Sequence, residues 1–149
     1  MRLYIDGDAF PNLLKPIVLR SIERLKIPTQ VVANKKISIG KSSFITYIVV
    51  NQGADVADDY IADQCREHDL VITADIPLAD RIITKDAHAI DHRGTLYNKE
   101  NMKHALAMRN LMESIRESGE MTKGPAAFTP KDAHAFANQL NAFLAKHFR

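Results

Sequence analysis

Two short apolar runs in this sequence are each followed at once by aspartates. The run Leu3-Tyr4-Ile5 leads into Asp6-Gly7-Asp8, and the run Leu70–Thr73 leads into Ala74-Asp75. Apolar runs of this length are typical of buried parallel strands. The carboxyl ends of parallel strands meet at one edge of a sheet, where ligands bind. We therefore expect Asp6, Asp8 and Asp75 to lie together at such an edge.

A second group of aspartates, Asp55, Asp58 and Asp59, occurs at spacings of three and four residues. These spacings place side chains on one face of a helix. Aspartate is also common at turns and helix N-termini because its carboxylate caps free N–H groups, so Asp55 or Asp80 alone is equally well explained as a cap. Taken together, the strand ends and this helix predict one acidic pocket.

Carboxylates held this close repel one another unless protons or cations intervene. Oxygen ligands without His or Cys are those that Mg²⁺ or Mn²⁺ prefers. Such an ion lowers the pKa of a bound water and can orient it towards a phosphodiester. The six histidines form no zinc motif and are interpreted as surface residues, and no Gly-rich phosphate loop, nucleophile elbow or Cys–His pair occurs.

The apolar periodicity predicts the elements that must position these acids. Strands are expected at 3–5, 29–33, 44–50 and 70–73, and helices from about 12 or 16 to 26, at 55–67, from 77 onwards, at 99–118 and at 130–148. The segment around Ala89-Ile90 is expected to be strand or loop. Strands alternating with helices predict an α/β fold with a mainly parallel sheet covered by helices on both faces, followed by two C-terminal helices.

Length and composition suggest one domain over residues 1–149, and no apolar stretch is long enough to cross a bilayer. The N-terminus lacks the features of a signal peptide, so a cytoplasmic protein without a membrane partner is expected. The lone Cys65 is expected to be a buried, inert thiol.

The charges are divided unevenly along the chain. Residues 1–80 carry 9 Lys and Arg against 11 Asp and Glu, whereas residues 81–149 carry 11 against 7. An acidic pocket beside a basic surface suits an anionic substrate such as nucleic acid. The candidates for phosphate contacts are Lys35, Lys36, Lys41, Arg93 and Arg109.

Three segments carry a resemblance to a known family. The motifs at 6–11, 53–61 and 69–79, supported by Gly124-Pro125 and the final helix, resemble the bacterial YaiI/YqxD family over nearly the whole chain. That family looks like a branch of the PIN-like nucleases, in which acids hold a divalent metal for cleavage of RNA or DNA. The resemblance implies a single PIN-like domain and metal-binding roles for Asp6, Asp75 and either Asp58 or Asp59.

Two positions depart from these patterns. Phe10 stands where the YaiI/YqxD pattern usually has Cys, which argues against an essential thiol there. Pro77 stands where PIN-like nucleases often carry a further acid, so a second metal would require Asp80 to reach the site from the next turn.

Three functions follow as hypotheses. The leading one is a metal-dependent nuclease or phosphodiesterase acting on RNA or DNA, with RNA favoured. Its ion, Mg²⁺ or Mn²⁺, is held by Asp6, Asp75 and Asp58 or Asp59, with Asp8 or Asp55 positioning water. The second is a phosphatase of the haloacid dehalogenase type with Asp6 as nucleophile and Asp8 as acid/base. The third is a non-catalytic nucleic-acid-binding protein that retains an acidic pocket.

Overall fold

Five parallel strands form the centre of the protein. The computed structural model describes residues 1–53, 55–119 and 126–148, so the Gly124-Pro125 motif lies outside the described residues. Within this part, the strands β1 (Leu3–Asp6), β2 (Thr29–Ala33), β3 (Ile45–Val49), β4 (Leu70–Ile72) and β5 (His88–Ile90) form one all-parallel sheet in the order β3-β2-β1-β4-β5. The predicted α/β architecture is confirmed, and the short His88–Ile90 segment is its fifth strand.

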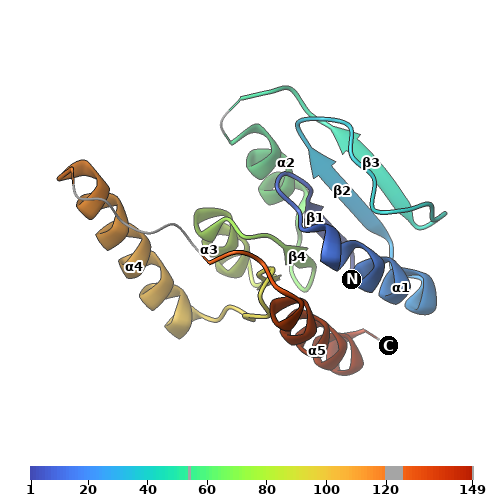
Figure 1. Ribbon diagram of the computed structural model, residues 1–149. Coiled ribbons are helices and arrows are strands. Elements are labelled where there is room, and N and C mark those ends of the chain that lie inside the picture. Colours follow the sequence, from blue (N-terminus) through green and yellow to red (C-terminus); the bar gives the residue numbers. More distant parts are fainter. Residues whose placement is uncertain (54, 120–125, 149) are drawn as a thin grey trace.

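Helices cover both faces of this sheet (Figure 1). The helices are α1 (Lys15–Leu25), α2 (Val56–Gln64), α3 (Ile76–Thr84), α4 (Lys99–Glu117) and α5 (Pro130–His147), with a short 3₁₀ turn at Asn12–Leu14. Leu3 and Ile5 pack with α1 and α5 on one face, whereas Tyr4 packs with α2 and α3 on the other. This division follows from the strand pleat, which turns alternate side chains to opposite faces.

The centre of the sheet contains a topological switch point. From β1 the chain continues to β2 on one side, whereas β4 pairs with the opposite edge of β1. In open parallel sheets the crevice beyond the strand ends at such a point is the usual ligand site. Asp6 ends β1, and Asp75 ends the turn between β4 and α3, so both aspartates flank this crevice.

The last two helices differ in how they are packed. Five residues of α5 are buried, and they include Phe136 and Phe143 of the predicted apolar stripe. Met102 is the buried residue of the longer α4, which extends away from the sheet beyond α3 (Figure 1). None of the described helices is long and apolar enough to cross a membrane. Cys65 is buried as expected, and burial raises the pKa of its thiol to about 12.

Candidate functional site

Asp6 lies at the end of β1, with only 9% of its surface exposed. The Thr73 hydroxyl donates to its Oδ2 at 2.9 Å, and the Asp8 backbone N–H donates to its Oδ1 at 3.3 Å. Burial raises the pKa of Asp6 to about 6 even though both hydrogen bonds lower it, and the negative charges of Asp8 and Asp75 raise it further. Asp6 is therefore a carboxyl group that can gain or lose a proton near neutral pH.

The strand register explains why Thr73 reaches Asp6. Ile5 of β1 pairs with Ile72 of β4, so the next residues along the two strands, Asp6 and Thr73, lie side by side on the same face. Thr73 is fully buried, and its hydroxyl also accepts the Asp75 backbone N–H at 3.0 Å. One hydroxyl thus links the aspartates of both strand ends. The sequence pattern does not single out Thr73.

Asp75 and Asp58 bring two negatively charged groups close together. Asp75 is the N-cap of α3, where its Oδ1 accepts the Leu78 backbone N–H at 3.0 Å. Asp58 reaches it from the first turn of α2. Burial raises the pKa of Asp58 to about 7, and the neighbouring Asp75 carboxyl group and the negative charges of Asp6 and Asp55 add to this rise. Asp58 can therefore gain or lose a proton near neutral pH.

The other predicted acids differ in their placement. Asp8 accepts the Asn34 backbone N–H at 3.1 Å, which ties the loop after β1 to the end of β2. Asp55 precedes α2 in a left-handed conformation with φ of 68° and contributes negative charge near Asp58. Asp59 is exposed and forms an ion pair with Arg81 at 2.8 Å. Asp80 lines a separate hollow between α3 and α4. The structure thus gathers Asp6, Asp8, Asp55, Asp58 and Asp75, and leaves Asp59 and Asp80 outside this cluster.

The predicted cations are spread over several parts of the molecule. Lys35 and Lys36 follow β2 after Asn34, at the same sheet edge as Asp6. Lys41 precedes Phe44, whose carbonyl accepts the N–H of the first β2 residue, so Lys41 lies towards the opposite end of the sheet. Arg109 on α4 pairs with Glu113 at 3.0 Å and lines a cavity beside Asp75.

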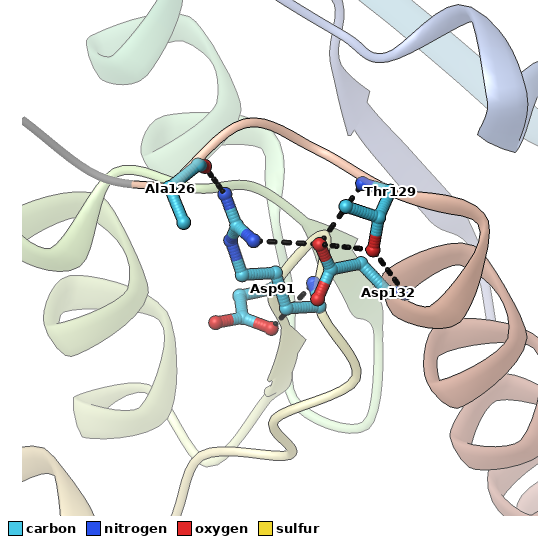
Figure 2. Close-up of polar contacts among 5 residues, drawn as sticks. Asp91, Ala126, Thr129 and Asp132 are labelled. Carbon is cyan, nitrogen blue, oxygen red and sulfur yellow. Dashed lines mark hydrogen bonds and ion pairs between the residues drawn. The ribbon is translucent and has the colours of Figure 1, made fainter.

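Arg93 takes part in a structural network. Its guanidinium donates to Asp132 at 2.7 Å and to the Ala126 carbonyl at 2.6 Å, and it lies 5.6 Å from the ring centre of Phe128. Figure 2 shows how this network joins the segment at Ala126 to the capped start of α5 at Thr129 and Asp132. In this arrangement Arg93 holds the segment before α5 against the loop that follows β5.

The cavity beside Asp75 has a volume of about 790 Å³. Its walls come from the loops after β1, β4 and β5, from one side of α4 and from Phe128. His92, which was expected on the surface, is in fact buried with 8% exposure and lines this cavity. That expectation was wrong because His92 follows the last strand and packs edge-on against the Phe10 ring, with the ring centres 5.3 Å apart.

The described residues contain no group of three or more His, Cys, Asp or Glu side chains already arranged to hold a metal ion. The expected ligand set of Asp6, Asp58, Asp59, Asp75 and Asp80 is therefore not assembled as such. Mg²⁺, however, is commonly bound through one or two carboxylates, with water and substrate phosphate completing its shell. The neighbouring pair Asp58 and Asp75 fits this smaller donor set, and the raised pKa of Asp58 reflects burial together with nearby negative charge, which a cation would offset.

Comparisons with known proteins show which family the chain matches. A protein-family model described as "Uncharacterized BCR, YaiI/YqxD family" matches residues 4–146. No solved structure matches the chain.

Similar full-length proteins occur in several bacteria. A UPF0178 protein of a Sulfurovum species is 77% identical over 147 residues, which cover 99% of both chains. A UPF0178 protein of Sulfurimonas denitrificans is 69% identical over 99% of this chain and 97% of its own. A third, from a Marinomonas species, is 52% identical over the whole of both chains.

Proposed function

This chain belongs to the YaiI/YqxD family, and we propose that it is a metal-dependent phosphodiesterase that hydrolyses nucleic acid at the carboxyl edge of its sheet. The observation that carries the proposal is that the negative charges of Asp58, Asp75 and buried Asp6 lie close enough to raise the pKa values of Asp58 and Asp6. Repulsion between these carboxyl groups destabilises the fold, and packing alone does not require them to lie close together. Carboxyl groups with shifted pKa values in a crevice are typical of functional sites. The resemblance to PIN-like nucleases supports the same assignment.

The chemistry can be assigned to individual side chains. Asp58 and Asp75 would hold the divalent ion, which, when bound, lowers the pKa of a water and offsets charge on the leaving oxygen. Asp6, whose pKa burial raises to about 6, is suited to accept the proton of the attacking water. Thr73 orients Asp6 through its 2.9 Å hydrogen bond. Asp8 and Asp55 lie at the margin, where they can orient water.

Cations on both sides of the acids would hold the strand. Lys35 and Lys36 lie at the end of β2, and Arg109 lies on α4 across the cavity from the sheet. Phosphate contacts of this kind set affinity and position without reading sequence. RNA is the favoured substrate, with DNA as the alternative.

Manganese binding tests the metal site directly. Mn²⁺ affinity would be measured by calorimetry for the wild type and for Asp58→Asn and Asp75→Asn, with Asp59→Asn as the matched control. Asp59 adjoins Asp58 on the same helix but pairs with Arg81, so its variant should bind Mn²⁺ as the wild type does. Loss of a charged ligand should weaken binding at least about tenfold in the two test variants.

Hydrolysis would be followed with labelled single-stranded RNA and DNA in the presence of Mg²⁺ or Mn²⁺. Equal Mn²⁺ affinity in all four proteins, or no cleavage with either ion, would contradict the proposal. A stable beryllofluoride adduct on Asp6 would instead favour the phosphatase mechanism.

A further inference from the structure

The cavity of about 790 Å³ shares a wall with the acidic site, because Asp75 and its neighbours Ala74 and Ile76 line it. Its size lies within the range of roughly 300–1,000 Å³ that is usual for small-molecule sites. A substrate group next to a phosphate at Asp58 and Asp75 would therefore enter this space. The chemistry of the other walls indicates what that group is.

One wall carries a buried polar atom without a partner. His92 is 8% exposed, and its Nε2 makes no hydrogen bond to any of the described residues. Leaving such an atom unpaired costs about 1–3 kcal/mol. Because Nε2 is itself buried, a ligand supplies the missing bond only if the imidazole ring turns towards the cavity that His92 lines. Burial lowers the pKa of His92, so the ring is neutral at physiological pH and can either donate or accept.

The remaining walls combine apolar surface with charges of both signs. Met108 and Met112 of α4 and the Phe128 ring supply the apolar surface. Arg109 and Arg116, which also lie on α4, supply guanidinium groups, and Arg109 pairs with Glu113 of the same wall at 3.0 Å. A ligand that matches these walls has a flat ring with a polar edge and a negatively charged group that replaces Glu113 as the partner of Arg109.

We propose that this cavity binds an unpaired nucleotide: its base packs against Phe128 and the α4 methionines, its polar edge bonds to His92 Nε2, and a phosphate contacts Arg109 and Arg116. Base faces stack on aromatic and apolar side chains in many single-strand binders. A paired base is stacked inside a duplex, so its edge and faces are not free to enter a cavity. The orientation of the scissile phosphate towards Asp75 rests on the hydrolase function proposed above. Nucleotide binding in the cavity does not depend on that function.

Calorimetry with mononucleotides tests this assignment. The probes are AMP, GMP, CMP and UMP, with ribose 5-phosphate as the probe that lacks a base, each measured with and without Mn²⁺. At least one mononucleotide should bind about tenfold or more tightly than ribose 5-phosphate. His92→Leu should weaken that binding about tenfold, which is the usual worth of one buried hydrogen bond.

A second pair of variants keeps the test valid if His92→Leu does not fold. Ala105→Trp places a large ring on the cavity wall of α4 and should abolish mononucleotide binding. Leu111→Trp is the matched control, because Leu111 is 52% exposed on the same helix and does not line the cavity. Equal mononucleotide affinity in these two variants would overturn the proposal, as would mononucleotides that bind no better than ribose 5-phosphate.

Competition distinguishes the source of the nucleotide. If a single-stranded RNA hexamer displaces the bound mononucleotide, the cavity binds a nucleotide of a strand. If the hexamer does not displace it, the cavity binds free nucleotides. Both results support binding of an unpaired nucleotide. Equal displacement by the blunt duplex of that hexamer would contradict it. If Mn²⁺ instead binds equally to wild type and to Asp58→Asn, the proposed hydrolase fails while the mononucleotide result stands.

Discussion

Asp58 and Asp6 are each more easily protonated in the folded protein than in the unfolded chain, and this difference makes stability depend on pH. Their folded pKa values are about 7 and about 6, whereas the ordinary pKa of an aspartate is 3.8. Between these values the folded state binds more protons than the unfolded state, so stability falls as pH rises. The free energy of unfolding should therefore be highest near pH 4, decline up to about pH 7, and stay low above it.

The variant Asp58→Asn tests this pH dependence. It removes the charge that is costly above pH 7, so at pH 8 the metal-free variant should be more stable than the wild type by about 1 kcal/mol, a figure discounted because Asp58 is partly exposed. At pH 4 the two proteins should be equally stable. Urea unfolding at pH 4, 6 and 8 provides the measurement. Asp59→Asn, which breaks an exposed ion pair, should show no such gain, and a wild type that becomes more stable from pH 4 to pH 8 would refute the assignment.

Individual residues show where prediction from sequence reaches its limit. Asp6 and Asp75 can be found because each directly follows an apolar run, and parallel pairing places both at one edge. The choice between Asp58 and Asp59 depends on the rotation of α2, which adjacent positions do not reveal; the structure turns Asp58 towards Asp75 and Asp59 towards Arg81. The role of Thr73 requires the β1–β4 register, and that of His92 requires the packing of the loop after β5.

Helix α3 connects helix stability with the site because Asp75 is both its N-cap and a proposed metal ligand. Asn and Asp are about equally good N-caps, whereas Ala lacks a side-chain acceptor and costs about 1 kcal/mol. Asp75→Asn and Asp75→Ala remove the same charge, so the difference between them isolates the cap. Thermal unfolding should show Asp75→Ala to be less stable than Asp75→Asn by about 1 kcal/mol.

Mn²⁺ calorimetry on the same two variants separates the roles. Both should bind Mn²⁺ with reduced affinity, because both substitutions remove the carboxylate charge. If Asp75→Asn keeps wild-type Mn²⁺ affinity, Asp75 acts as a cap alone.

The sequence pattern predicts the boundaries of some helices and strands better than those of others. The strand predicted at 29–33 has the same bounds as β2, because Pro28 precedes it and a polar segment follows its apolar residues Val31, Val32 and Ala33. The helix predicted at 55–67 ends earlier, at Gln64, because Cys65 is extended and turns the chain back towards β4. β5 has only three residues, and so short an apolar pattern does not distinguish a strand from a loop. Its pairing with β4 shows that the segment is a strand.

The molecule as a whole divides into a tightly packed sheet and a peripheral helix. β1 and β4 are central strands whose residues are almost all buried, whereas α4 has one buried residue in 19. Local opening costs little free energy where few apolar contacts are lost. The proposed nucleotide cavity uses one side of this helix from His104 to Arg116, so ligand binding and local stability are expected to be linked.

Hydrogen exchange measures this link. In the free protein, backbone amides of residues 108–117 should exchange faster than those of any strand and faster than those of α5. Helix α5 is the internal control, because it has 18 residues and five buried side chains. Adding the mononucleotide that binds most tightly should slow exchange in residues 108–117, because the ligand bridges α4 and the loop at His92. The strands and α5 should not change. Equal protection of α4 and α5 in the free protein would contradict the packing difference, and unchanged exchange at a saturating mononucleotide concentration would contradict the placement of the ligand against α4.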